Sequence, residues 1–316
     1  MTKKQRHEAL VALTFLAPNL AGFVVFSLFP IVASLALAFF RWSPLHGLDN
    51  IAETARFVGA QNFWDVLGFH THADGSRAPN DAFFWKYLGN TFFLMLGIPF
   101  SILGSLLLAT LLSKRLHGTA FFTTLFFLPS ITSGVATYTI WLALLNDETG
   151  LINGLLRSVG LEGPRWLLDT GWSKPSLILM GLWGSIGGHN LVLYIAALQS
   201  IPRDLYEAAE IDGAGAVKMF RHITWPMVSP TTFFIFTMSI IHGFQGGFAA
   251  AYIMTRGGPA GSTTTLSYYI YNLAFSRAFE MGYASAIAWI LFVITLAMSL
   301  VNWRYGRRQV HGEFTS

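Results

Sequence analysis

Residues 207–230 read EAAEIDGAGAVKMFRHITWPMVSP, a polar stretch within a chain of mostly hydrocarbon side chains. The stretch carries two Glu, one Asp, one Lys, one Arg and one His. A window without Asp, Glu, Lys or Arg precedes it at 175–202, and another overlaps its end at 222–255. Because about 20 apolar residues let a helix span a bilayer, the pattern predicts a loop outside the hydrocarbon between two membrane-spanning helices.

The same alternation continues along the whole chain. Of its 316 residues, 53% are hydrophobic and 11% are charged, whereas soluble domains carry about 25% charged residues. Windows free of Asp, Glu, Lys and Arg occupy residues 9–40, 87–113, 116–146, 175–202, 222–255 and 281–303. A lipid-exposed backbone must satisfy its own hydrogen bonds, as helices do. We therefore predict an all-α integral membrane protein with six transmembrane helices, since a soluble protein would need a very large polar shell to bury them.

The N-terminus begins with a basic segment, MTKKQR, like that of a secretory signal peptide. The apolar run that follows is far longer than a signal h-region of about 7–15 residues, so we interpret it as an uncleaved first helix. The chain contains no cysteine, and cysteine usage therefore says nothing about its compartment. We expect three parts: residues 1–86 with the N-terminal tail, first span and a periplasmic loop, residues 87–305 with five spans, and a tail at 306–316.

Lys and Arg predict the orientation, because cytoplasmic loops of membrane proteins are enriched in both. The segments on one side are 1–8, 113–118, 203–224 and 304–316, and they hold 11 basic and 6 acidic residues. The loops on the other side are 41–86, 147–174 and 256–280, and they hold 9 basic and 10 acidic residues. Basic residues are thus denser in the first set, and we predict that both termini and the loop at 203–226 lie in the cytoplasm.

The loop at 203–226 is predicted to contain two short helices. Pro202 stands near the start of the first helix, Asp204 is a candidate N-cap, and Glu207 three residues later completes a capping-box pattern. Gly213 follows where helices commonly end in the left-handed conformation. The loop is therefore expected to be a helix, a glycine corner and a second helix.

The second helix is predicted over AGAVKMFRHITW, residues 214–225, where Val217, Phe220 and Ile223 share one face. Pro226 and Pro230 are then expected to begin the fifth span. On composition alone, an amphipathic loop lying at the membrane surface explains this stretch equally well.

The order of residues in this loop is more specific than its composition. It resembles the EAA motif of permease subunits in bacterial ABC importers, with matches at Glu207, Ala208, Ala209, Asp212, Gly213, Ala214, Phe220, Ile223, Pro226 and Pro230. The resemblance implies a type I importer fold in which the first short helix docks in a groove of the ATP-binding subunit. It implies coupling roles for Glu207, Ala208, Ala209, Asp212, Gly213, Ala214 and Phe220. Small alanines suit a helix that lies deep in a groove, a common recognition mode.

A second stretch, residues 252–289, is similar to the segment before the last helix of carbohydrate permeases, which handle maltose, other oligosaccharides, polyols and glycerol-3-phosphate. Its landmarks are GGP at 257–259, TTTL at 263–266, Tyr271, Ala274-Phe275 and GYASA at 282–286. The segments LPSIT (128–132) and LQSIPRDLYEAA (198–209) match the same group. The resemblance covers roughly residues 85–305, and the loop at 41–86 matches nothing in it.

Several kinds of chemistry are missing from the sequence. It has no GxxxxGK[ST] phosphate loop, so the chain itself cannot be the ATPase. It also has no HExxH motif, no paired cysteines and no carboxylate within a span. Ion-coupled carriers usually need an intramembrane ionisable group or an ion site at a broken helix, which leaves a secondary transporter as a remote alternative. We expect neither catalytic residues nor a metal site.

Polar side chains within spans are costly and usually face an interior path. The candidate substrate contacts are Ser130, Thr132, Ser133, His189, Asn190, Ser239, His242 and Gln245. For a single Ser or Thr, a hydrogen bond to its own helix backbone is the commoner explanation, and for each His an interhelical bond is equally plausible. The resemblance to maltose-type permeases implies contacts at Ser130, Gly134, the His189 region, Ser239 and Gly243.

These observations lead to one expectation. The chain is a permease subunit of an ATP-driven importer for a carbohydrate, or alternatively for glycerol-3-phosphate or another small solute, in the inner membrane of a bacterium. Its expected partners are the lipid bilayer, two ATP-binding cassette subunits, a second homologous permease and an extracytoplasmic solute-binding protein, with no nucleic acid. The chain is expected to bind no cofactor, and ATP and Mg to be bound by the partner subunits.

Overall fold

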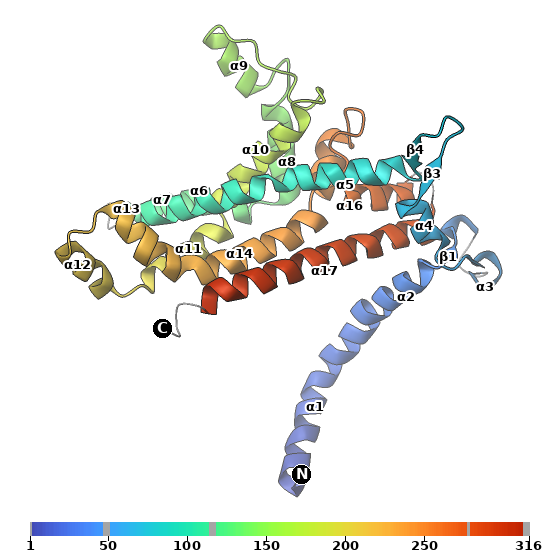
Figure 1. Ribbon diagram of the computed structural model, residues 1–316, viewed down its shortest axis with the longest axis horizontal. Coiled ribbons are helices and arrows are strands. Elements are labelled where there is room, and N and C mark those ends of the chain that lie inside the picture. Colours follow the sequence, from blue (N-terminus) through green and yellow to red (C-terminus); the bar gives the residue numbers. More distant parts are fainter. Residues whose placement is uncertain (1, 47–50, 114–117, 277–278, 312–316) are drawn as a thin grey trace. The chain divides into compact units, whose positions relative to one another are not determined.

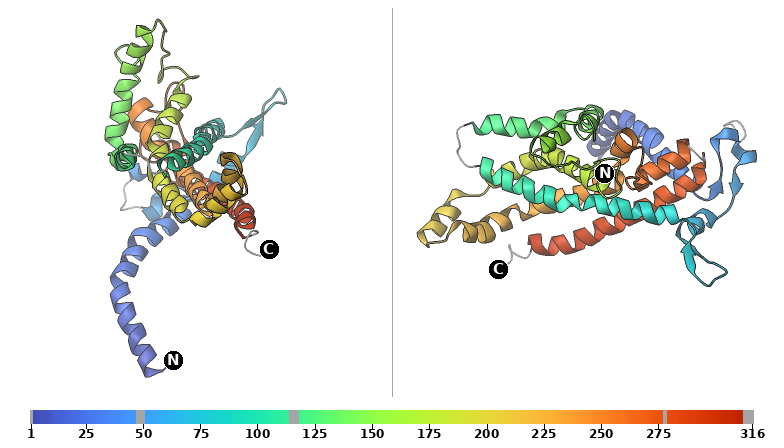
Figure 2. Two further views of the ribbon diagram at one scale, coloured as in Figure 1. Left: turned by 90° about the vertical axis from the view of Figure 1, so that its left-hand side faces the viewer. Right: turned by 90° about the horizontal axis from the view of Figure 1, so that it is seen from above.

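The computed structural model describes residues 2–46, 51–113, 118–276 and 279–311, and helices dominate it (Figures 1 and 2). Lys114 and Arg115, which contribute to the predicted orientation, and the last residues of the predicted tail at 306–316 lie outside the described residues. The chain forms two compact units. The first unit comprises Met1–Ala82 and Ile270–Ile290, and the second comprises Phe83–Tyr269 and Leu291–Ser316.

The first unit begins with one long apolar helix. It consists of α1 (Lys3–Phe23), a π-helical turn η1 (Val24–Leu28) and α2 (Phe29–Leu37). Thr2 caps its start, because the Thr2 hydroxyl accepts from the Gln5 N–H at 3.3 Å and the Gln5 side chain accepts from the Thr2 N–H at 2.9 Å. None of its side chains is buried within the chain, which fits a helix surrounded by lipid or by another subunit.

The predicted periplasmic loop folds into short elements. They are β1 (Phe40–Arg41), η2 (Pro44–His46), α3 (Ile51–Thr54), β2 (Arg56–Phe57), α4 (Gln61–Leu67), β3 (Phe69–Thr71) and β4 (Arg77–Pro79). The strands form two antiparallel pairs, with Phe40 opposite Phe57 and His70 opposite Ala78. At the turn of the second pair, the hydroxyl and N–H of Ser76 both donate to Asp74 and lower the pKa of its carboxyl.

The first unit also contains the segment from Ile270 to Ile290. It holds the end of α16 (Leu266–Tyr271), a π-helical turn η5 (Asn272–Ser276) and the first turns of α17 (Met281–His311). Gly282 lies so close to the carbonyl of Phe40 that a Cβ there would collide with it. The last long helix therefore begins against the end of the first one.

The second unit holds the remaining helices. They are α5 (Ala82–Met95), α6 (Gly97–Leu112), α7 (Thr119–Ile131), α8 (Gly134–Leu144), α9 (Leu151–Ser158), α10 (Ser173–Ile186), α11 (His189–Gln199), α12 (Arg203–Ile211), α13 (Ala216–Met219), η3 (Phe220–Thr224), α14 (Trp225–Gln245), α15 (Phe248–Ala250) and η4 (Ala251–Thr255), with parts of α16 and α17. Helices α6, α11 and α14 pack against one another (Figure 1).

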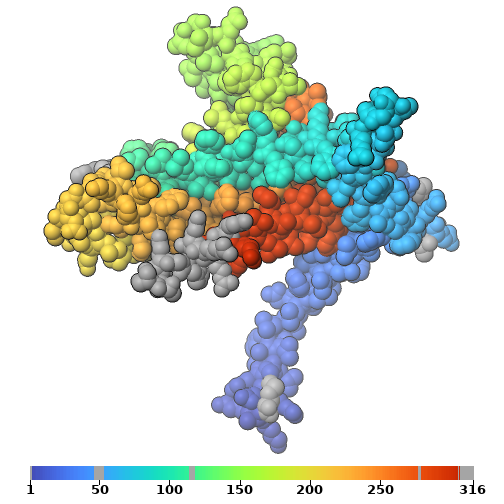
Figure 3. Space-filling view, in the orientation of Figure 1, coloured from blue at the N-terminus to red at the C-terminus, as the bar shows by residue number. Residues whose placement is uncertain are grey.

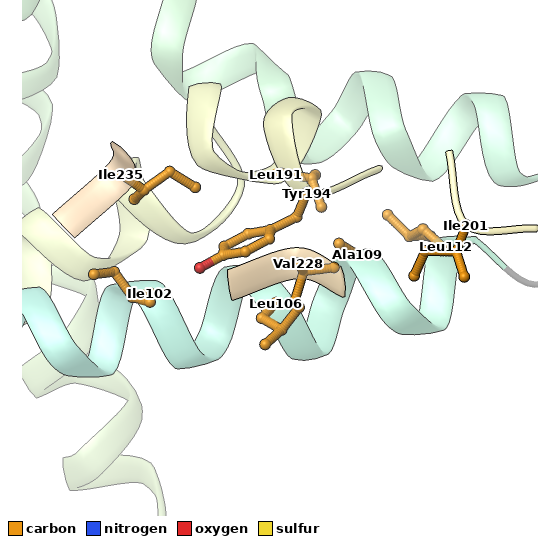
Figure 4. Packing of buried hydrophobic residues seen from close by; sticks show 9 residues of the cluster. All are labelled: Ile102, Leu106, Ala109, Leu112, Leu191, Tyr194, Ile201, Val228 and Ile235. Carbon is orange, nitrogen blue, oxygen red and sulfur yellow. The ribbon is translucent and has the colours of Figure 1, made fainter. Parts of the chain in front are cut away.

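Their shared core is a compact cluster of buried side chains, of which nine are drawn in Figure 4. Four successive turns of α6 contribute Ile102, Leu106, Ala109 and Leu112. Tyr194 of α11 lies at the centre and is fully buried, and its hydroxyl donates to Thr232 at 3.0 Å. Because lipid tails are as apolar as these side chains, close packing and such interhelical bonds hold the helices together.

The opposite face of α6 is exposed and apolar. Phe100, Leu103, Leu107 and Leu111 recur at helical spacing on that face, and all four are more than half exposed. Helices α5 and α6 are drawn in cyan on the visible face in Figure 3. An apolar stripe outside the packed core is what a membrane-spanning helix presents to lipid or to a second subunit.

Two of the six predicted spans are broken. The window at 116–146 divides into α7 and α8, which meet at an angle of 99°, and the window at 175–202 divides into α10 and α11 at 40°. Within the described residues, four helices are long and apolar enough to cross a membrane, or six if each bent pair forms one span. At the second break, Gly187 lies against the backbone of Phe126, where no side chain would fit.

Candidate functional sites: the 203–226 loop and a polar cavity

The loop at 203–226 has the predicted order of a helix, a glycine corner and a second helix (Figure 1). Helix α12 ends at Ile211, and Gly213 adopts φ +73°, so the left-handed conformation predicted for it is confirmed. The N–H of Ala214 donates to the carbonyl of Ala209 at 2.8 Å and closes the corner. This tight turn requires glycine, because other side chains are strained at positive φ.

The predicted capping box is wrong. Pro202 occupies the N-cap position and no side chain caps the helix, so Asp204 falls in its first turn. Pro202 has an extended ψ of 134°, and the chain therefore enters α12 directly at Arg203. In the first turn the negative charge of Asp204 still faces the positive end of the helix dipole.

The second helix also differs from expectation, because it does not end before the fifth span. Helix α13 continues through the π-helical turn η3 into α14, and the N–H of Trp225 donates to the carbonyl of Phe220. Pro226 has no N–H to give to a regular helix, and a π-turn accommodates such a local change in register. As a result, the loop and the fifth span form one continuous helical element.

Apolar side chains of the loop point away from the second unit. Ile211 is 87% exposed and Val217 is 81% exposed, although Val217 was predicted to share a face with Phe220 and Ile223, which pack against the core. Glu207 is exposed on the same loop. Exposed large aliphatic side chains that lie close together on a loop are a common feature of surfaces that bind another protein.

The second unit also encloses a cavity of about 470 Å³. Helices α5 and α6 form one wall, α10 and α11 another, and α14 with the residues after it a third. The polar side chains among its lining residues are Thr91, Ser101, Tyr138, Ser185, His189, Asn190, Ser239, His242 and Thr265. The volume falls in the usual range for small-molecule sites, about 300–1,000 Å³.

Four predicted contacts line this cavity: His189, Asn190, Ser239 and His242. The other four, Ser130, Thr132, Ser133 and Gln245, are not among its lining residues. The hydroxyls of Ser130 and Thr132 donate to carbonyls of their own helix, at 2.7 and 3.1 Å. Ser130 still lies beside the cavity wall, because its Cβ is 3.2 Å from where a Cβ of Gly188 would stand.

Four of the polar side chains that line the cavity differ in hydrogen bonding from most hydroxyls of the helices. Thr110, Thr123 and Thr139 face other surroundings and donate to the carbonyl four residues earlier. By contrast, within the described part of the chain, no hydrogen bond joins the side chains of His189, Asn190, Ser239 or His242 to any group. The cavity therefore gathers polar groups that are free to bind a solute with hydrogen-bonding groups of its own.

Most lining residues were not predicted from the sequence, and Ser101 and Met95 are two examples. Ser101 of α6 is buried, and its hydroxyl has no partner among the described residues. The Met95 side chain fills the space beside Gly243, because a Cβ on Gly243 would stand 2.8 Å from the Cγ of Met95. Charge-free windows give no sign of which Ser or Met faces a path, so only the packing reveals them.

Among the residues that the structure describes, no group of three or more His, Asp or Glu could hold a metal ion.

The fold and these two sites define the class: a helical membrane protein with a polar cavity between its helices and an exposed loop of two short helices. Residues 82–309 match the family described as the binding-protein-dependent transport system inner membrane component. The chain belongs to this family.

Curated relatives extend over almost the whole chain. A probable ABC transporter permease, YurN of Bacillus subtilis, is 34% identical and covers 94% of this chain and 96% of its own length. The lactose transport system permease protein LacF of Rhizobium radiobacter is 33% identical, covering 93% of each. The sn-glycerol-3-phosphate transport system permease protein UgpA of Pectobacterium atrosepticum is 31% identical, also covering 93% of each.

A solved structure shows the same fold. It is a chain of the bacterial alginate ABC transporter in complex with an alginate pentasaccharide-bound periplasmic protein. The two chains superpose with a TM-score of 0.81 over 98% of each, at 23% sequence identity. This chain therefore shares its overall fold with a chain of that transporter.

Proposed function

We propose that this chain is the permease subunit of an ATP-driven importer for a carbohydrate, such as an oligosaccharide, a disaccharide or a related polyol. The observation that carries the proposal is the cavity between α6, α11 and α14, where four polar side chains lack partners within the described chain. A hydroxyl-rich solute would satisfy such groups. The similarity to LacF supports a sugar as cargo.

The cavity supplies matched chemistry for this cargo. His189 and His242 can each donate and accept hydrogen bonds, Asn190 offers both amide groups, and Ser239 offers a hydroxyl. The apolar lining residues, among them Met95 and Met180, exclude water around these polar groups. Ser130, Thr132, Ser133 and Gln245 complete the proposed substrate path, in line with the carbohydrate permeases that the sequence resembles.

The loop at 203–226 is proposed to couple this path to ATP hydrolysis. Two ATP-binding subunits, which bind ATP and Mg, would each bind one short helix: α12 of this chain in one subunit, and the equivalent helix of a second homologous permease in the other. A solute-binding protein would deliver cargo from the extracytoplasmic side, with both termini of this chain in the cytoplasm. ATP binding would then shift the population between inward-open and outward-open states, as the partners bind one state more tightly than the other.

Purification with partners and hydrolysis measurements test this function. The chain is co-expressed with its ATP-binding subunits, its second permease and its binding protein, and the complex is placed in lipid nanodiscs. We expect co-purification of the ATP-binding subunits and faster ATP hydrolysis when the binding protein carries a carbohydrate. A chain that purifies without them and moves solute without ATP would be a secondary transporter instead.

A second cargo is supported by a specific pair of observations. UgpA, a relative at 31% identity, belongs to an sn-glycerol-3-phosphate system, and His189 and His242 both line the cavity and can donate to phosphate oxygens. A thermal-shift screen of the cognate binding protein with neutral sugars, polyols and sn-glycerol-3-phosphate separates the two cargoes. If only sn-glycerol-3-phosphate stabilises the binding protein, the proposed solute is this phosphate ester and not a carbohydrate.

A further inference from the structure

The first unit has a cavity of its own, about 690 Å³ in volume. It is lined by Arg41, Trp42, Ser43, Thr54, Asn62, Asp65, Asn80, Glu280 and Tyr283. These residues come from the loop at 41–86 and from the start of α17, and the charge pattern places them on the extracytoplasmic side. None of the residues proposed for transport or for coupling lies in this unit.

The frame of this cavity is fixed by hydrogen bonds. Asn62, only 1% exposed, donates to the carbonyls of Ala38 and Phe40 at 2.8 and 3.0 Å and so joins α4 to the end of the first long helix. The Tyr283 hydroxyl donates to Asp81 at 2.7 Å and holds the start of α17 to the loop. The walls therefore have a defined shape.

Three polar groups in the walls remain without partners in the described chain. Both hydrogen bonds of the Asn62 side chain use its amide nitrogen, so its Oδ1 accepts none within the described chain. The buried indole N–H of Trp42 has no acceptor, and the exposed carboxylate of Glu280 makes no hydrogen bond or ion pair. A buried polar group without a partner is costly, which makes its presence in a cavity wall informative.

The charges in the cavity disfavour an anionic ligand, because the carboxylate of Glu280 has no counter-ion among the described residues. Arg41 and Asp65 already neutralise one another at 3.3 Å, and Asp65 also accepts from Gln61 at 2.7 Å. What remains is a set of hydrogen-bond donors and acceptors with two aromatic side chains, Trp42 and Tyr283. Hydroxyl groups both donate and accept, whereas a basic side chain of a protein partner would use only the acceptors.

We propose that this cavity is a second carbohydrate subsite, which binds a neutral oligosaccharide outside the membrane through Asn62, Trp42 and Glu280. The inference rests on the proposed function, because it takes the same class of solute as the cargo. It gives the loop at 41–86 a role that its sequence does not indicate: a subsite that binds sugar independently of the cavity lined by His242.

Saturation-transfer NMR on the complete transporter in nanodiscs, without its binding protein, tests this subsite with maltose, lactose and maltopentaose as probes. We expect a saturation-transfer signal from at least one probe in the wild type. Glu280→Gln removes the free carboxylate, and no hydrogen bond of that side chain within the described chain is lost. Trp42→Phe removes the N–H. Each should weaken probe binding about tenfold, since one hydrogen bond to the ligand is lost.

Two matched variants make the result specific. Glu148→Gln changes an exposed carboxylate of the second unit, outside this cavity, and should bind the probes like the wild type. His242→Ala alters the other cavity and should keep the signal from this subsite. No signal from any probe in the wild type, or unchanged binding in both Glu280→Gln and Trp42→Phe, overturns the subsite.

The same variants separate this inference from the proposed function. If Trp42→Phe only removes a buried unpaired donor, its melting temperature should be equal or higher and carbohydrate import unchanged, and the subsite is then wrong while the proposed function stands. If the wild-type complex imports no carbohydrate at all, the proposed function fails, whereas the subsite is still decided by the saturation-transfer signal and its loss in the two variants.

Discussion

The hydroxyl groups of Tyr206 and Thr224 lie 2.8 Å apart and join α12 to the base of α14. Thr224 is buried, and Tyr206 packs against the core cluster together with Phe220 and Ile223. About 22 Å further along the same continuous helix, at the usual rise of about 1.5 Å per residue, Ser239 lines the cavity. A force on α12 would therefore act directly on the element that forms one cavity wall.

This relationship gives the first prediction. Tyr206→Phe leaves the Thr224 hydroxyl buried without its partner, which costs about 1–3 kcal/mol, so the melting temperature should fall and less solute should be imported per ATP hydrolysed. The double variant Tyr206→Phe with Thr224→Val removes both polar groups. It should regain stability but not the import ratio, measured as labelled solute against released phosphate. An import ratio equal to that of wild type in both variants would show that the bond transmits nothing.

The second prediction concerns the bend between α10 and α11. A side chain at Gly187 would collide with the backbone of Phe126, which cannot rotate away. Gly187→Ala should therefore cost about 1–3 kcal/mol through overpacking and lower both the yield and the melting temperature of the complex. Gly184→Ala is the matched control, because a Cβ there meets nothing within 4 Å. Equal effects of the two substitutions would mean that the close approach at Gly187 does not determine the bend.

These bends also show what hydropathy can predict. Charge-free windows identify where the chain can enter lipid, because one charged side chain there is costly, and the long apolar segments were found in this way. They do not show that 116–146 and 175–202 are broken, because Thr132, Ser133, Gly187 and Gly188 are uncharged. At the second break, Gly187 meets the backbone of Phe126, a residue far away in the sequence, and the composition of a window cannot show such a contact.

At the two candidate sites, the sequence likewise predicted local features but not those that depend on packing. The conformation of Gly213 follows from local backbone preference and was predicted from the sequence. The predicted N-cap at Asp204 was wrong, because the helix begins two residues earlier, with Pro202 at the N-cap position. In the cavity, Ser239 and His242 were found because polar residues are rare in spans. Ser130 and Ser101 are both serines in apolar windows, and only packing distinguishes the back-bonded one from the buried one without a partner.

The third prediction concerns orientation. The chain has no cysteine, so single cysteines report their own accessibility. With an impermeant thiol reagent on cells whose outer membrane has been permeabilised, Arg77→Cys in the hairpin β3–β4 should be labelled and Lys218→Cys in α13 should be spared until the inner membrane is opened. The reverse pattern would invert the predicted topology.

The fourth prediction concerns cargo. Ser239→Ala and His242→Ala each remove a free polar group from the cavity wall, and the loss of one hydrogen bond to a solute costs about 1–1.5 kcal/mol, or roughly tenfold in binding. Transport and substrate-stimulated ATP hydrolysis should fall by about that factor, while assembly and basal hydrolysis stay as in wild type. Thr139→Ala, whose hydroxyl is bonded to its own helix, serves as the control. Normal transport in both cavity variants would remove α14 from the substrate path.

The last prediction separates a coupling loop from an amphipathic loop on the membrane surface. Gly213 and Gly215 both have open space where a Cβ would stand, but only Gly213 has a positive φ, of +73°. Gly213→Val therefore introduces backbone strain of about 1–3 kcal/mol without any collision, whereas Gly215→Val should be tolerated.

Glu207→Lys reverses an exposed charge on α12, and like charges across an interface can cost several kcal/mol. In nanodiscs, Gly213→Val and Glu207→Lys should release the ATP-binding subunits more readily and lose substrate-stimulated hydrolysis, and both should still insert into the membrane because insertion depends on the spans. On a surface loop that only touches lipid, Glu207→Lys would instead strengthen attraction to anionic headgroups. Retention of the ATP-binding subunits and full stimulation in both variants would therefore rule out coupling through α12, and lipid-dependent binding of Glu207→Lys would identify the surface loop.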